Sequence, residues 1–113
     1  MDDCIFCKIA SGEIPAKVVF QDDHVFAFHD INPVAPVHIL VIPKKHLASL
    51  SEADPGDQEL LGRVLAGAKK AAEIAGVSKT GFRTVINTGK SAGQSVFHLH
   101  AHVIGGKEQG WPP

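Results

Sequence analysis

The sequence lacks the features that mark membrane-spanning, exported and nucleic-acid-binding proteins. Its longest clean aliphatic run is Ile39–Ile42, whereas a membrane-spanning helix needs about 20 apolar residues. The acidic start, Met1–Asp3, has neither the basic region nor the apolar stretch of a signal peptide. Lysine and arginine form no block longer than the pairs Lys44–Lys45 and Lys69–Lys70, which gives a nucleic-acid groove no compositional support. We therefore expect a cytoplasmic protein that binds neither a membrane nor a nucleic acid.

Cysteine is also scarce, since the chain has only Cys4 and Cys7. Without an export signal, two cysteines suggest a reducing compartment and a metal site rather than a disulfide framework. Their C-x-x-C spacing is half of a common zinc site, but no compact pair of histidines follows it. On spacing alone, a pair of buried thiols is an equally good interpretation.

Histidine is the residue that the chain has in surplus. The formal charge of −1 counts 11 basic and 12 acidic residues and leaves out seven histidines, whose charge depends on their surroundings near neutral pH. The remaining composition, 44% hydrophobic and 20% charged over 113 residues, is that of an ordinary globular protein. We find no repeat or linker and expect a single domain over residues 1–113.

Hydrophobic patterning predicts an α+β fold, with an antiparallel sheet of five strands and a helix packed on it. The expected strands cover residues 17–21, 24–29, 38–42, 82–87 and 97–104. A loop with two prolines is expected over residues 32–36. Asp54 and Pro55 predict the start of a long helix, and Gly76 predicts its end. Its apolar face is expected to hold Leu60, Leu61, Val64, Leu65, Ala68, Ala71, Ala72 and Ala75.

The last predicted strand carries three histidines at alternate positions: His98, His100 and His102. Alternate residues of a strand share a face, so the apolar residues between them, from Phe97 to Val103, are expected to face the core. Neighbours on that face lie roughly 6.5–7 Å apart along a strand, whereas ligands of one zinc lie only ~2 Å from the ion. A single zinc site made of all three histidines is therefore disfavoured, and we expect them to divide several roles.

The loop before this strand suggests an anion-binding site. Gly89, Gly93, Gln94 and Ser95 are typical of turns whose backbone N–H groups face an anion, although an ordinary flexible connection is about equally good. A phosphate held there would lie beside the imidazoles. A neutral imidazole can attack phosphorus and form a covalent intermediate, and a second one can protonate the leaving group.

The stretch His98–Ile104 fits the His-x-His-x-His-x-x signature at every position, and the chain resembles the histidine triad (HIT) family. The similarity is to its Hint branch, in the bacterial form with an N-terminal C-x-x-C pair. Further similar segments are Ile5–Phe6, Lys8–Ile9, Glu13–Lys17, Ala27–Ile31, Ala35–His38, Pro43–His46, Gly93–Val96 and Trp111–Pro113. The fold implied is a five-stranded antiparallel sheet with one long and one short helix, which dimerises into a sheet of ten strands.

The resemblance implies a purine nucleoside phosphoramidase that hydrolyses the P–N bond of adenosine 5′-phosphoramidates. His100 would attack the α-phosphorus, and water would then release AMP from the nucleotidyl-histidine. His102 would contact the phosphate oxygens and the leaving group, Ser95 would bond near the leaving nitrogen, and His38 would support the triad. An ordinary structural role is equally good for His38, and His24 and His29 are expected to be surface residues.

The same resemblance implies the substrate-binding residues. Asn87 and Gln94 would hold the phosphate, and Asp30 would accept from the ribose hydroxyls, which suits a carboxylate. Trp111 would cross the dimer interface and shape the partner's leaving-group site. The base pocket would consist of Ile5, Phe6, Ile9, Phe28 and Ile31, for which plain core packing is the alternative.

The resemblance also completes the cysteine pair. Cys4, Cys7, His46 and His98 would form a closed tetrahedral zinc site, which is structural, so that no cofactor is required for the chemistry. Three other functions are kept as alternatives. They are a nucleotide-binding adaptor, a zinc hydrolase that uses the triad as ligands, and a related dinucleoside polyphosphate hydrolase or nucleotidyl transferase.

Overall fold

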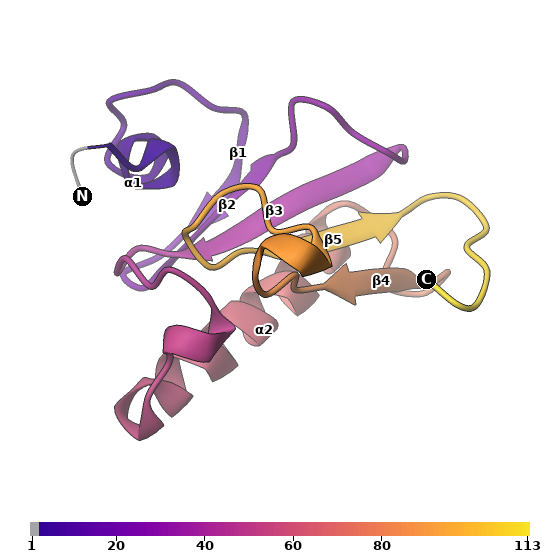
Figure 1. The fold of residues 1–113 in the computed structure, drawn as a ribbon. Coiled ribbons are helices and arrows are strands. Elements are labelled where there is room, and N and C mark those ends of the chain that lie inside the picture. The colour runs from indigo at the N-terminus through magenta and orange to yellow at the C-terminus, as the bar shows by residue number, and fades with distance from the viewer. Residues whose placement is uncertain (1–2) are drawn as a thin grey trace.

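A five-stranded antiparallel sheet lies between a long helix on one face and a short helix on part of the other (Figure 1). This computed structural model describes residues 3–113; Met1 and Asp2, on which the signal-peptide expectation partly rests, lie outside the described residues. The helices are α1 (Ile5–Ala10) and α2 (Gln58–Ile74), and the strands are β1 (Val18–Gln21), β2 (Val25–His29), β3 (Val37–Pro43), β4 (Phe82–Val85) and β5 (Ala101–Gly105). The predicted α+β architecture is confirmed. No helix in the described part of the chain is long and apolar enough to cross a membrane.

The strands lie in the order β1-β2-β3-β5-β4, and every neighbouring pair is antiparallel. The register pairs His38 with Ile104 and Leu40 with His102 across β3 and β5. Because side chains alternate along a strand, these four residues share the face that α1 partly covers. The opposite face packs on α2.

The helix α2 begins later than Asp54 predicts. Asp54 does form a capping box, but with Gly56 and Asp57 in a 3-10 turn over Pro55–Asp57, and α2 follows at Gln58. The predicted stop at Gly76 holds, since Ala75 is the C-cap and Gly76 has a φ of 80°. A positive φ of this kind is cheap for glycine and strained for other residues.

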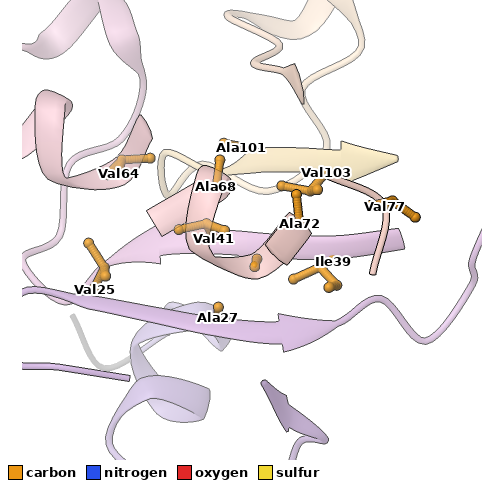
Figure 2. Packing of buried hydrophobic residues seen from close by; sticks show 11 residues of the cluster. Val25, Ala27, Ile39, Val41, Val64, Ala68, Ala72, Val77, Ala101 and Val103 are labelled. Atoms are coloured by element: carbon orange, nitrogen blue, oxygen red, sulfur yellow. The ribbon is translucent and has the colours of Figure 1, made fainter. Parts of the chain in front are cut away.

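The core between α2 and the sheet consists of small and β-branched residues (Figure 2). Gly67, which the apolar pattern missed, lies over the sheet so closely that a Cβ there would be 3.0 Å from Val41 Cγ1. The prediction that Leu65 belongs to the buried face is wrong, because this residue is more than half exposed. The helix approaches the sheet along the row of Val64, Gly67, Ala68, Ala71 and Ala72, which turns Leu65 outward.

The predicted strand over residues 97–104 is wrong at its beginning, because β5 starts only at Ala101. Before that point the chain leaves its strand partners, and the backbone N–H of Leu99 donates to the Leu47 carbonyl at 2.6 Å. Phe97, predicted to face the core, is 51% exposed. His98 and His100 therefore lie on an irregular segment, where strand alternation does not set their direction.

Candidate active site

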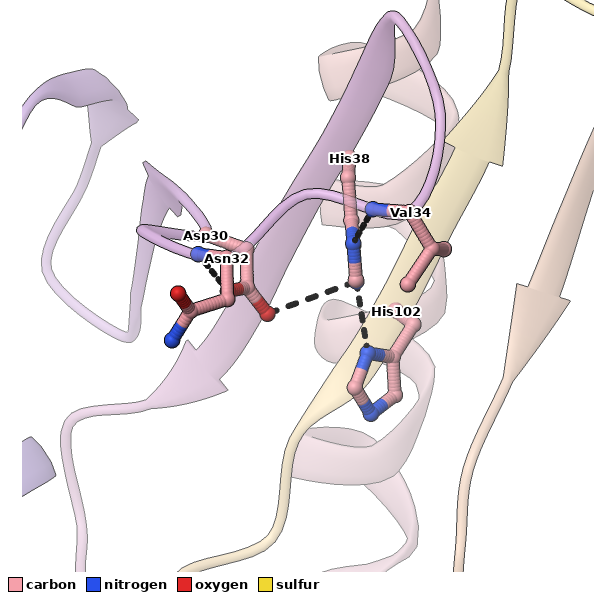
Figure 3. A network of polar contacts seen from close by, with 5 residues as sticks. All are labelled: Asp30, Asn32, Val34, His38 and His102. Atoms are coloured by element: carbon pink, nitrogen blue, oxygen red, sulfur yellow. Dashed lines mark hydrogen bonds and ion pairs between the residues drawn. The ribbon is translucent and has the colours of Figure 1, made fainter.

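His38, His102 and Asp30 form a polar network at one end of β3 (Figure 3). The backbone N–H of Val34 donates to His38 Nδ1 at 3.1 Å, so this nitrogen is an acceptor and the proton of the neutral ring is on Nε2. His38 Nε2 lies 2.9 Å from His102 Nδ1 and 3.4 Å from Asp30 Oδ2. His38 thus donates to His102, which leaves the proton of neutral His102 on its own Nε2.

The loop over residues 30–36, which connects β2 to β3, closes this network. Asp30 directly follows β2, and its backbone N–H donates to the carbonyl of His38 at 3.0 Å. Its other carboxylate oxygen, Oδ1, accepts from the N–H of Asn32 at 2.8 Å, which holds the side chain in an Asx turn. The prolines of the loop, Pro33 and Pro36, cannot continue the strand pairing. The chain therefore returns to His38 within hydrogen-bonding distance of Asp30.

His100 has the opposite tautomer. Its Nδ1 lies 2.8 Å from the backbone carbonyl of His98, which can only accept, so Nδ1 carries the proton and Nε2 carries the free lone pair. The ring is buried, with its centroid 5.0 Å from that of His102 and 5.1 Å from that of Phe6. A bare imidazole nitrogen beside a second imidazole is the arrangement that nucleophilic attack and proton donation require.

Burial makes His102 hard to protonate. The pKa of His102 is lowered to about 4, chiefly by burial and further by the nearby His100 and His38, while Asp30 opposes this shift. In the absence of substrate, His102 is therefore neutral near pH 7. An anion bound beside the ring would favour its protonation, because an opposite charge stabilises the charged form.

Cys4, Cys7, His46 and His98 form a second cluster, whose four donor atoms lie within 4.8 Å of one another. Cys4 is the N-cap of α1 and Cys7 lies in its first turn, so the short helix presents both sulfurs to the core. His98 Nδ1 lies 3.3 Å from Cys4 Sγ and 3.5 Å from Cys7 Sγ, and His46 Nδ1 lies 3.4 Å from Cys7 Sγ. In a tetrahedral zinc site, a sulfur and a nitrogen ligand are about 3.5 Å apart. The donor set therefore fits a metal ion.

His98 presents a bare nitrogen to the sulfurs. Its other nitrogen, Nε2, donates to the backbone carbonyl of Pro43 at 2.7 Å, as the non-ligating nitrogen of a metal-bound histidine usually does. Burial, and then the nearby His46 and His100, lower the pKa of His98 and keep its ring neutral. Burial also raises the pKa of the Cys7 thiol, with further contributions from Cys4, so a bound cation would have to displace the thiol protons.

A cavity of about 760 Å³ opens beside Asp30 and His38, within the range of small-molecule sites. Its lining includes three of the predicted base-pocket residues, Ile9, Phe28 and Ile31. Ile31 is 90% exposed and is therefore accessible to a ligand in this cavity. The sequence analysis did not predict the other lining residues as part of the site; they are Pro15, Ala16, Lys17, His29, Pro33 and Pro36.

Two predicted base-pocket residues lie elsewhere. Ile5 lines a different hollow, together with Cys4, His46 and Ser95. Phe6 is buried between the cavity wall and the triad, with its ring edge toward Phe28 and His100. Its contact with His100 had no signal in the sequence, because residues 6 and 100 meet only through the tertiary fold.

The predicted phosphate-binding residues lie on the loop before His98. Gln94 is buried, and its side chain accepts from the N–H of Gly89 and donates to the carbonyls of Ala48 and Val96. Both hydrogens of this amide are thus used within the protein. The Asn87 amide donates to the Ala92 carbonyl across the same loop at 2.9 Å, and Ser95 is exposed.

The segment after β5 folds back beside β4. The Arg83 guanidinium donates to the Gly110 carbonyl, and the Gln109 amide donates to the Ile104 carbonyl. Trp111 is 87% exposed and does not line the cavity beside Asp30. Within one chain, the structure does not bring Trp111 to the triad.

Comparison with known proteins gives a consistent result over nearly the whole chain. A family model described as "HIT domain" matches residues 11–109. Protein HitA of Neisseria gonorrhoeae is 52% identical over 105 residues, which cover 93% of this chain and 97% of that protein. A HIT family hydrolase from Legionella pneumophila is 50% identical, with a TM-score of 0.95 and coverage of 98% and 99%. A histidine triad protein from Clostridium difficile is 47% identical, with a TM-score of 0.94 and coverage of 97% and 96%.

Proposed function

The chain belongs to the HIT family, and we propose that it is a hydrolase of the Hint branch that cleaves the P–N bond of adenosine 5′-phosphoramidates and releases AMP. The observation that carries this proposal is the pair of opposite tautomers at His100 and His102. The first has a lone pair on Nε2, and the second has a proton on Nε2, with the ring centroids 5.0 Å apart. The similarity to HIT family hydrolases supports the same conclusion.

His100 is the proposed nucleophile. Its Nε2 attacks the α-phosphorus, so that a bond from phosphorus to His100 forms while the bond to the leaving amine breaks. The departing nitrogen takes its proton through Nε2 of His102, which His38 holds in place through its 2.9 Å bond. Water then attacks phosphorus and returns a proton to His102, the bond from phosphorus to His100 breaks, and AMP leaves.

The nucleotide is proposed to lie in the 760 Å³ cavity. Its base would contact Ile9, Phe28 and Ile31, and the ribose hydroxyls would donate to Asp30, which lines the cavity beside His38. Phosphate contacts are assigned to Ser95 and Asn87. Because the Gln94 amide hydrogens are already used, Gln94 would act by holding the loop rather than by direct contact.

We assign Cys4, Cys7, His46 and His98 as ligands of a zinc ion, which the fit of the donor distances supports. When bound, zinc would cross-link α1 to the rest of the fold as a structural ion. It is not required for the chemistry at phosphorus. Metal analysis of protein purified without chelator tests this assignment, and a Cys4→Ser/Cys7→Ser variant should lose the ion.

We also propose a homodimer. The strand β4 is an edge of the sheet, and unpaired edges are protected in most proteins. The exposed Trp111 next to this edge supports the role of the C-terminal segment in the partner's leaving-group site. Sedimentation of the wild-type protein should give the mass of two chains, and a mass of one chain would contradict the proposal.

The direct test of the reaction is to trap the intermediate. Wild-type protein mixed with an adenosine 5′-phosphoramidate and quenched early should gain the mass of one AMP, located on His100. The His100→Ala variant should gain none and should lose hydrolysis by a factor on the order of 10⁴. A His24→Ala variant is the matched control, because His24 is exposed in the β1–β2 turn. Undiminished turnover in His100→Ala would end the covalent mechanism, and binding without any turnover in wild type would favour the adaptor alternative.

A further inference from the structure

We propose that the Cys4/Cys7/His46/His98 cluster, when it holds a divalent cation, is a positioning device for the nucleophile, so that the metal controls the orientation of His100. This inference rests on the proposed function in two respects, the metal site and the role of His100. It goes further because it connects them, with His98 and Phe6 as positioning residues. Neither would touch the reacting atoms.

The first connection runs through His98, whose ring faces the two cysteines and whose backbone carbonyl contacts His100. Its Nδ1 faces the two sulfurs at 3.3 and 3.5 Å, and its Nε2 donates to the Pro43 carbonyl. Its backbone carbonyl accepts the Nδ1–H of His100 at 2.8 Å, the bond that leaves Nε2 free to attack. The ring of His98 is 0% exposed, so it has no room to rotate independently.

The second connection runs through α1. Phe6 lies between Cys4 and Cys7 in the sequence, and its ring meets that of His100 edge-on, with centroids 5.1 Å apart and planes at 89°. The same ring lies 6.1 Å from that of His98. A cation that holds both sulfurs therefore also holds the aromatic wall against which His100 packs.

The segment that carries His98 and His100 is buried but is not part of the sheet. His98 and His100 precede β5 and are outside the strand pairing that begins at Ala101. The bond from the Leu99 N–H to the Leu47 carbonyl attaches the segment to residues 44–49, which also carry His46. Without a cation, the cluster is held by thiol–imidazole contacts of 3.3–3.5 Å, which are weak hydrogen bonds. With a cation, coordinate bonds replace them.

The size of the effect follows from how far His100 moves. Loss of a group that orients a metal ligand typically costs 10–100-fold in metal affinity or activity, and a displacement of 1 Å in an active site can cost about 100-fold. The nucleotide cavity contains none of the four cluster residues, and Ile9 is the part of α1 that lines it. We therefore expect loss of the metal to lower kcat about 10-fold or more and to change KM less than kcat.

The test compares three states of one protein preparation: loaded with zinc, stripped of zinc by a chelator, and reloaded with Zn²⁺ or Co²⁺. In the 15N-imidazole NMR spectrum without substrate, the metal-loaded protein should show His100 as the Nδ1–H tautomer with a slowly exchanging proton. After metal removal, this signal should broaden or shift, while His38 and His102 keep theirs. Unchanged signals of His38 and His102 would show that the fold is retained. Reloading should restore both the His100 signal and kcat.

Two variants make the test independent of folding problems. His46→Ala removes a ligand that has no contact with His100, and it should weaken Co²⁺ binding and reproduce the fall in kcat of metal-free wild type. Phe6→Leu leaves all four ligands in place; it should bind one Co²⁺ with thiolate charge-transfer bands but show a several-fold lower kcat. The exposed His24→Ala variant is the control for each.

The outcomes separate this inference from the proposed function. If metal-loaded wild type hydrolyses no phosphoramidate, the proposed function fails, and the NMR comparison still decides whether metal and His100 are coupled. If the enzyme is active and neither kcat nor the His100 signal changes when zinc is removed, the coupling is wrong. If neither Zn²⁺ nor Co²⁺ binds, the metal site and the coupling fall together while the nucleophile assignment stands.

Discussion

The structure contains two clusters of histidines that use the same side chain in two different ways. In both His38 and His98, a backbone group holds the nitrogen that faces away from the cluster. For His38 that group is the N–H of Val34, which donates to Nδ1, so the ring presents an N–H to His102. For His98 it is the carbonyl of Pro43, which accepts from Nε2, so the ring presents a lone pair to the cysteines.

The difference between the two clusters therefore lies in the backbone behind the ring rather than in the histidines themselves. Asp30, His38 and His102 bring three donor atoms within 4.8 Å and could be taken for a second metal site. A cation on His38 Nε2 would require a proton on Nδ1, which would face the N–H of Val34 at 3.1 Å. The His38 cluster is thus suited to passing protons, and the His98 cluster is suited to holding a metal.

For the comparison of the two clusters, the largest expected effect comes from replacing one histidine of each cluster with asparagine. His38→Asn removes the donor to His102 Nδ1, and we expect kcat/KM to fall about 100-fold with the metal retained, in the range for loss of acid–base support. His46→Asn should show the reverse pattern, with the metal lost and a smaller fall in activity. Steady-state kinetics and metal content on both variants check this. Equal kinetic and metal effects in the two variants would contradict the division of roles.

A second prediction concerns the number of cations bound. Titration with Co²⁺ should saturate at one equivalent and produce thiolate charge-transfer bands. The His38→Asn variant should behave in the same way, whereas Cys4→Ser/Cys7→Ser should bind none. A second equivalent that disappears in His38→Asn would show that the Asp30/His38/His102 group is a metal site after all.

A third prediction concerns stability. Because the metal cross-links α1 to residues 46 and 98, chelation should lower the Tm of wild type by about 5 °C or more. The same chelator should leave the Tm of Cys4→Ser/Cys7→Ser unchanged, since this variant has no ion to lose. Thermal unfolding followed by circular dichroism measures both. A chelator effect of equal size in the variant would place the stabilising ion elsewhere.

The smallest effect is the pH dependence that His102 contributes. Burial lowers the pKa of His102 from 6.5 to about 4, so the unfolded chain takes up a proton before the folded one does. The stability linked to this residue is complete above pH 6.5 and is lost as the pH falls toward 4. Between pH 7 and pH 5, wild type should lose a few °C more in Tm than His102→Asn, which keeps an acceptor for His38. Identical slopes would contradict the neutral state of the half-buried His102.

The sequence predicted the sheet and α2 because periodicity reports directly on which face is buried. It overestimated the length of the last strand, because pairing depends on partners that the local pattern does not contain: the N–H of Leu99 bonds to Leu47 instead of a strand. The cysteine–histidine set came from family resemblance, since Cys4 and His98 are 94 residues apart. The tautomers were outside the reach of the sequence, because they depend on the backbone of Val34 and Pro43.

The most direct test of this division of roles is the tautomeric state of the four histidines, read in one long-range 1H–15N NMR spectrum of metal-loaded protein at pH 7. His38, His98 and His102 should carry their proton on Nε2, with Nδ1 of His98 shifted by the metal. His100 should carry its proton on Nδ1. A proton on Nδ1 of His38, or on Nε2 of His100, would contradict the assignment of the two clusters.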